Sequence, residues 1–150
     1  MKFLKLNRTE YERAIMKILS DFGDGTLKAG QYVLDSITRI PDGFSHIRLK
    51  VAEFLLRLEE LGEVLVIFDQ HPSNAASRLQ LLRIFGIDED IPALRVSNSD
   101  LAPFLINGDC DLYIVDNNGR LLAVASHEDE TFGNERRIWC PIPLEKVNAD

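Results

Sequence analysis

The sequence contains few of the residues and motifs that usually indicate a particular chemistry. Its 150 residues include two cysteines, one tryptophan and three histidines. The two cysteines, Cys110 and Cys140, fit a reducing compartment, and we expect both to be unpaired thiols near strands. The GxSxG motif of serine hydrolases is absent, as are the HxH, HExxH and paired-cysteine spacings of metal sites. We therefore expect no cofactor and no metal.

Long apolar runs are absent too. No stretch approaches the length needed to cross a membrane, and the N-terminal residues 1–10 have too short an apolar run for a signal peptide. Basic residues are also scarce, since 17 Lys and Arg stand against 24 Asp and Glu, which gives a net charge of −7. That charge repels phosphate backbones. We expect a cytoplasmic protein that binds neither membranes nor nucleic acid, and whose acidity suits a basic partner.

What the sequence does contain is typical of one globular domain spanning residues 1–150, with 45% apolar and 27% charged residues. Two apolar stripes at helical spacing predict helices from about Glu10 to Phe22 and from about Ser45 to Leu61. Thr9 and Glu12 have the spacing of a capping box for the first helix. Residues 26–41 are ambiguous between helix and strand, and we favour a helix.

The second half of the chain predicts strands. Val64–Phe68 is a continuous apolar run, which is typical of an interior strand covered by helices on both faces. We expect a helix from Ala75 to Phe85 that ends at Gly86, a short edge strand at Ala93–Val96 and a short helix at Asp100–Ile106.

A central hairpin over residues 111–127 is the clearest signal. Its strands, Leu112–Val115 and Leu121–Ala125, are joined at Asn118-Gly119, and a tight turn demands the positive φ angles that glycine adopts readily. A last strand at Ile138–Cys140 should end where Pro141 and Pro143 prevent regular pairing.

The predicted fold is α/β, with α+β as the alternative. It has a mixed sheet of four to five strands, with helices packed on it. The predicted core comprises Ile15, Ile18, Phe54, Leu58, Val66, Phe68, Leu82, Tyr113, Val115, Leu122 and Val124.

Polar residues that follow two predicted strands form the candidate site. His127-Glu128-Asp129-Glu130 follows the hairpin, and a histidine beside carboxylates can act as a general base or help to bind a metal. Asp69 and His71 follow the Val64–Phe68 strand, and ligands often bind at strand ends in open α/β sheets. The two groups meet only if both strands end at the same edge of the sheet. The alternative is that both are solvated loops without chemistry. Trp139, the only tryptophan, is a further binding candidate because tryptophan is enriched in interface hot spots.

The strand Asp111-Leu112-Tyr113-Ile114-Val115-Asp116, followed by Ser126-His127-Glu128-Asp129, resembles a small bacterial domain family of unknown function. That family is similar in having a Tyr-Ile/Val-Val-Asp strand and then a strand that ends in Thr-His-Glu. Phe132-Gly133 looks like a remnant of the family's aromatic tail. This chain has Leu121 and Leu122 where a tryptophan is usual, and Ser126 in place of threonine. Similar endings occur in proteins that look like toxin-immunity partners. The resemblance implies a bacterial cytoplasmic protein, and it implies no catalytic residues.

Three functional hypotheses follow. The leading one is a non-enzymatic binding or inhibitor protein, of the immunity type, that binds a basic toxin through its acidic surface. The second is a small metal-assisted hydrolase that uses His127 and Glu128 with the Asp69–His71 turn. The third is a homodimeric scaffold that self-associates through Trp139 and the C-terminal segment.

Overall fold

The structure is a computed structural model, and it describes residues 3–22, 44–68, 75–87, 91–106, 111–125, 131–132 and 135–143. Its helices are α1 (Arg8–Phe22), α3 (Val51–Arg57), α4 (Ala75–Phe85) and α5 (Ala102–Ile106), with a short 3₁₀ helix, η2 (Asn98–Asp100). Its strands are β1 (Phe3–Lys5), β2 (Phe44–Lys50), β3 (Glu63–Phe68), β4 (Ala93–Ser97), β5 (Leu112–Val115), β6 (Leu121–Ala125), β7 (Thr131–Phe132) and β8 (Glu135–Pro143).

Seven of these strands form one sheet in the order β1-β4-β3-β5-β6-β8-β2, and β7 pairs with the beginning of β8. Every pairing among the described strands is antiparallel. The fold is therefore α+β. The prediction of helices packed on a sheet is confirmed, whereas the predictions of a mixed sheet and of only four to five strands are wrong.

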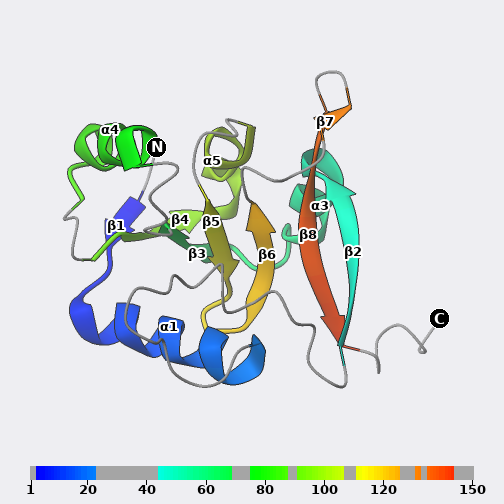
Figure 1. The fold of residues 1–150 in the computed structure, drawn as a ribbon, viewed down its shortest axis with the longest axis horizontal. Helices are drawn as coiled ribbons and strands as arrows, with labels where there is room; N and C mark the ends of the chain where they lie inside the picture. The colour runs from blue at the N-terminus through cyan, green and yellow to red at the C-terminus, as the bar shows by residue number, and fades with distance from the viewer. Residues whose placement is uncertain are drawn as a thin grey trace.

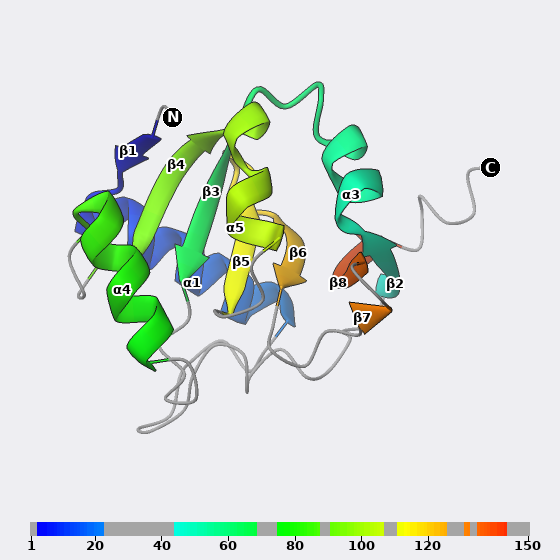
Figure 2. The same cartoon turned by 90° about the horizontal axis from the view of Figure 1, so that it is seen from above.

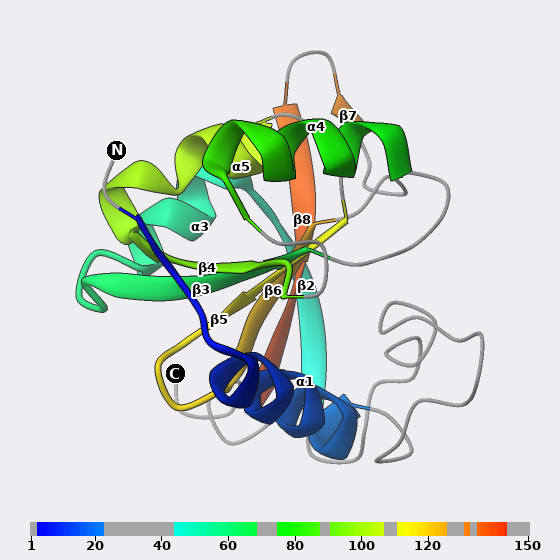
Figure 3. The same ribbon diagram turned by 90° about the vertical axis from the view of Figure 1, so that its left-hand side faces the viewer.

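The sheet is the middle of three layers (Figures 1 and 3). Helix α1 lies on one face, and α3, α4 and α5 lie on the other (Figures 2 and 3). Strand β3 is buried from Val64 to Phe68, as its continuous apolar run predicts for a strand covered on both faces. Strand β4 lies between β1 and β3, so the prediction that it is an edge strand is wrong.

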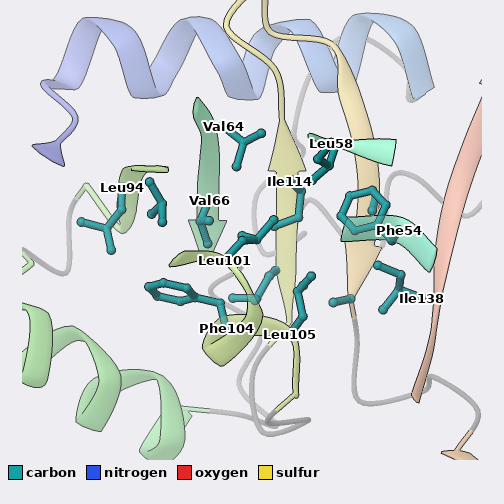
Figure 4. Close-up of a cluster of buried hydrophobic side chains, with 14 of the residues drawn as sticks. Phe54, Leu58, Val64, Val66, Leu94, Leu101, Phe104, Leu105, Ile114 and Ile138 are labelled. Carbon is teal, nitrogen blue, oxygen red and sulfur yellow. The ribbon is translucent and has the colours of Figure 1, made fainter. Parts of the chain in front are cut away.

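Each face of the sheet has its own apolar core. On the α1 face, Ile18 packs with Ile67, Tyr113 and Val115. On the opposite face, a larger cluster includes Phe54, Leu58, Val66, Phe68, Leu82, Phe104 and Ile138, part of which is drawn in Figure 4. Of the predicted core residues, nine are buried, and Ile15 and Leu122 are partly buried against these clusters.

Helix α1 begins earlier than predicted, because its cap is Asn7 rather than Thr9. The Glu10 backbone N–H donates to Asn7 Oδ1 at 2.8 Å, and the Asn7 N–H donates to a carboxylate oxygen of Glu10 at 3.3 Å. These two bonds are the reciprocal pattern of a capping box, located two residues before the predicted one.

The predicted helix at residues 45–61 is divided in the structure. Phe44–Lys50 is strand β2, and only Val51–Arg57 is helical. The sequence Ile47-Arg48-Leu49-Lys50 alternates apolar and charged residues, which also suits a strand. Pairing with β8 along all seven residues of β2 decides between the two patterns.

Strand β8 is longer than predicted because Pro141 does not end it. Pro141 pairs with His46 and Pro143 with Phe44, so the ladder with β2 continues past Pro141 and ends at Pro143. Along an antiparallel strand, backbone N–H groups point alternately toward one neighbouring strand and toward the other. A proline is therefore tolerated where its nitrogen faces away from the partner strand. The side of β8 turned away from β2 therefore lacks N–H donors at positions 141 and 143.

The central hairpin is confirmed, with an irregularity that the sequence pattern did not indicate. The Gly119 N–H donates to the Asp116 carbonyl at 3.0 Å, and Gly119 has a φ of 81°. Asp116 Oδ1 accepts the backbone N–H groups of Asn118 and Arg120, both at 2.9 Å. The register shifts between Ile114 and Val115, so Leu122 is the extra residue of a β-bulge.

Candidate functional sites

The first candidate site is the edge of the sheet at which β3 and β6 end. Both strands run antiparallel to β5, and their last residues, Phe68 and Ala125, each pair with Leu112. The two strands are therefore parallel to each other, about 10 Å apart, and end on either side of the first residue of β5. We call this end of the sheet, at which Asp111 precedes β5, the Asp111 edge.

Two buried charged residues lie at the Asp111 edge. Asp111 is 1% exposed and Arg136, near the start of β8, is 8% exposed. Arg136 Nη1 donates to the carbonyl oxygen of Leu105 in α5 at 2.9 Å. Because β8 runs antiparallel to β6, its first residues lie toward the end at which β6 stops. Burying charged groups is costly unless they are compensated, so their presence here indicates an organised polar environment.

The polar residues predicted from the sequence follow the strands that end at this edge. Asp69 comes directly after Phe68, and His127 comes two residues after Ala125. The residues themselves, Asp69, His71 and His127-Glu128-Asp129-Glu130, lie outside the described residues, so their roles stay predictions. Among the described residues, no three His, Cys, Asp or Glu side chains come together to form a metal-binding group.

The second candidate site is a groove on the outer surface of α3. Ala52, Leu55, Leu56 and Glu59 follow one another at i, i+3, i+4 and i+7, so they form one wall from a single face of the helix and its C-terminal turn. Asn98, Ser99 and Ala102 form the opposite wall. The hollow between them has a volume of about 510 Å³. We call it the α3 groove.

The walls of the α3 groove are fixed relative to each other. Asn98 Nδ2 donates to the carbonyl oxygens of Leu58 at 2.8 Å and Glu59 at 3.2 Å, and the Asn98 N–H donates to the Gly62 carbonyl at 2.9 Å. Carbonyls at a helix C-terminus need such partners. The amide of Asn98 therefore caps α3 and holds η2 against it.

The α3 groove combines an apolar wall with carboxylates. Leu56 is 66% exposed, so its side chain presents apolar surface to solvent in the groove. Glu59 lines the groove, Glu63 is paired in register with Ser97, and Asp100 ends η2. No motif in the sequence indicates a role for this surface. The sequence signal for this surface is Leu56, an apolar residue that lies outside the apolar stripe of the predicted helix.

Trp139 lies on the α1 face of the sheet. It is partly buried, packs against the α1-side core and pairs in register with Arg48 of β2 and Val124 of β6. Its predicted role in an interface stays a prediction. Cys140, the next residue, is a buried thiol with Sγ 3.8 Å from the Ile138 carbonyl oxygen, and Cys110 lies outside the described residues.

Comparisons of the chain with protein-family models, with curated proteins and with solved structures found no match. No described helix is long and apolar enough to cross a membrane. Function must therefore be inferred from the geometry of the two sites.

Proposed function

We propose that this protein is a non-enzymatic binding module that holds a basic segment of a protein partner in the α3 groove. The observation that carries the proposal is the exposed Leu56 in a groove lined by Glu59. Exposed apolar surface bordered by polar groups is typical of protein-binding sites. The net charge of −7 and the nearby carboxylates of Glu63 and Asp100 favour a partner whose contact surface is basic.

The partner class that fits this surface best is a basic toxin, held by this protein as an immunity protein holds its target. Complementary charge accelerates association, and an inhibitor of a toxin must bind before the toxin acts. The apolar wall of the groove supplies contact area that charge alone does not. The resemblance of the hairpin and its His-Glu ending to immunity-type proteins supports the same class.

Site-specific photo-crosslinking tests the groove. A crosslinking amino acid is placed at Leu56 or, as a control, at Ile84 of α4, because both side chains are 66% exposed. We expect position 56 to crosslink a basic protein in lysate of the source cells at low salt, and position 84 not to. The captured protein is then purified, and its Kd is measured with wild-type, Leu56→Lys and Ile84→Lys proteins.

Leu56→Lys should weaken binding by about ten-fold or more, because it removes apolar contact and adds a charge of the partner's own sign. Ile84→Lys should change the Kd by less than about two-fold. A partner that is acidic, or equal losses in both variants, would contradict the proposal. So would capture of a second copy of this chain at position 56, which would favour the homodimeric scaffold. The toxin class is checked by expressing the partner alone and together with this protein, and it is wrong if growth is the same in both cases.

A second candidate function is metal-assisted hydrolysis at the Asp111 edge. The observation that favours it is that β3 and β6 end at the same edge, beside the buried Asp111. The segments that contain His71 and His127 therefore start from neighbouring strand ends. Calorimetric titration with Zn²⁺ tests it. His71→Ala and His127→Ala should each abolish tight binding, whereas His46→Ala, in β2, should not. Binding that is unaffected by the first two variants would exclude this function.

A further inference from the structure

A second hollow lies on the other side of α3, between β6 and β8 where these two strands separate. These two strands pair only at Val124 and Trp139 among the described residues. Two residues away from this pair, Leu122 of β6 and Pro141 of β8 do not pair with each other. Pro141 has no N–H to donate, and the bulge at Leu122 bends β6. The strands diverge at this point, and they leave a hollow of about 300 Å³, which we call the β6–β8 pocket.

The floor of the β6–β8 pocket is apolar. Phe54 and Leu58 of the α3 segment, each 3% exposed, line it together with Leu121 and Cys140 of the two strands. Phe54, Arg57, Leu58 and Leu61 follow the i, i+3, i+4, i+7 pattern, which places them on a different face of the α3 segment from the residues of the α3 groove. The pocket is thus a separate site, and its occupancy does not depend on the proposed protein partner.

The rim of the pocket carries four charged residues, the arginines Arg57 and Arg120 and the carboxylates Glu60 and Asp116. Arg57 is exposed and Arg120 is partly exposed, and neither forms an ion pair with another described residue. Asp116, by contrast, already accepts two backbone N–H groups at Oδ1. One of these is the N–H of Arg120, so the backbone from which that guanidinium extends is fixed. Glu60, the remaining carboxylate, is exposed at the rim.

From this arrangement we infer that the β6–β8 pocket binds a small organic acid, with its apolar body on the Phe54–Leu58 floor and its carboxylate at Arg57 and Arg120. Guanidinium groups form charge-assisted, bidentate hydrogen bonds with carboxylates. Small-molecule sites are typically hollows of this size or larger, with mainly apolar walls and a few polar groups that fix the orientation of the ligand. Such a ligand would also stabilise the position of α3, since it would fill the space between the helix and the strands β6 and β8.

Three probes with the same apolar body test the inference: hexanoate, 1-hexanol and hexylammonium. Each is titrated into the full-length protein, and methyl NMR signals of Leu58 and Leu122 report binding at the pocket. We expect hexanoate to bind most tightly and hexylammonium most weakly. Arg57→Gln and Arg120→Gln should each weaken hexanoate binding by roughly three- to ten-fold, while 1-hexanol binding stays within about two-fold.

The matched control is Arg83→Gln, which removes the same charge from an exposed position on α4 away from the pocket. It should leave hexanoate binding within about two-fold of wild type. Equal binding of hexanoate and 1-hexanol would overturn the inference, because the arginines would then contribute nothing. Preference for hexylammonium, which would assign the pocket to Glu60 and Asp116, would also overturn it. Absence of shifts at Leu58 and Leu122 with all three probes would do the same.

Discussion

The two parts of the sheet differ in how completely they are joined. Strands β1, β4, β3, β5 and β6, which we call the central block, pair through ladders of three to five residue pairs, with one bulge at Leu122. Helices lie on both faces of this block (Figure 3). Strands β2 and β8 with helix α3, which we call the arm, also pair continuously with each other. Among the described residues, the strands of the arm and of the central block pair only at Val124 and Trp139, although their side chains share one apolar core. Both of the proposed binding hollows lie beside α3, where the arm meets the central block.

This difference shows how an antiparallel sheet can supply binding surfaces. A fully paired block leaves no space between its strands, because each backbone group is bonded to its neighbour and each face is packed. Where pairing stops, the backbone separates and a covering helix has less to pack against. The proline at position 141 and the bulge at Leu122 supply that interruption here.

The largest expected effect comes from removing a buried ring in each part. Phe68 of the central block is 1% exposed and makes an edge-to-face contact with Phe104 at a centroid distance of 6.2 Å. Phe54 of the arm is 3% exposed and borders the β6–β8 pocket. Phe68→Ala should lower the free energy of unfolding by about 3–5 kcal/mol. Phe54→Ala should cost about 1 kcal/mol less, because the space it leaves opens into an existing hollow.

Urea denaturation of both variants measures these differences, and hydrogen exchange locates them. In Phe54→Ala the amides of β2 and β8 should exchange faster, while those of β3 and β5 keep their protection. In Phe68→Ala protection should fall in the central block as well. Identical exchange patterns in the two variants would mean that the arm and the central block unfold as one unit.

An intermediate effect is expected at Arg136, which ties β8 of the arm to helix α5 through the Leu105 carbonyl at 2.9 Å. Arg136→Met keeps most of the side-chain volume but leaves that carbonyl without this donor. The unfolding free energy should fall by about 1–3 kcal/mol, which is the usual cost of an unsatisfied buried polar group. Thermal and urea unfolding check the value, with Arg83→Met on α4 as an exposed control that should change stability by less than about 0.5 kcal/mol. If Arg136→Met lowers the unfolding free energy by less than about 0.5 kcal/mol, the contact with Leu105 does not stabilise the fold.

How much the sequence could predict also differs between the two parts. In the central block, the apolar run at Val64–Phe68 and the hairpin around Gly119 are local signals, and both were predicted correctly. Strand β2 was predicted as part of a helix, because its residues fit a helical stripe as well as an alternation, and only pairing with β8 selects the strand. Local periodicity does not contain that long-range pairing.

The candidate sites depend even more on long-range contacts. Strands β3 and β6 end at the same edge because both lie beside β5. Residue spacing in the sequence does not reveal this strand order. The α3 groove requires η2 to lie against α3, through a contact between Asn98 and residues 40 positions earlier. Leu56 was visible in the sequence as a leucine outside the stripe, but the wall opposite it was not.

The smallest expected effect therefore also tests the contact that sequence reasoning missed. Asn98→Ala removes two hydrogen bonds to the C-terminal carbonyls of α3, at 2.8 and 3.2 Å. Because those carbonyls are near the surface and water can replace the amide, the loss should be only about 1 kcal/mol. Ser99→Ala, whose hydroxyl contacts Ser97 Oγ at 3.0 Å on the exposed side of η2, should change stability by less than about half as much. Urea unfolding gives both values, and hydrogen exchange should be faster in α3 for the Asn98 variant alone. If α3 exchanges at the wild-type rate without the Asn98 amide, the groove is held by its apolar wall, and Leu55 rather than Asn98 becomes the residue to replace.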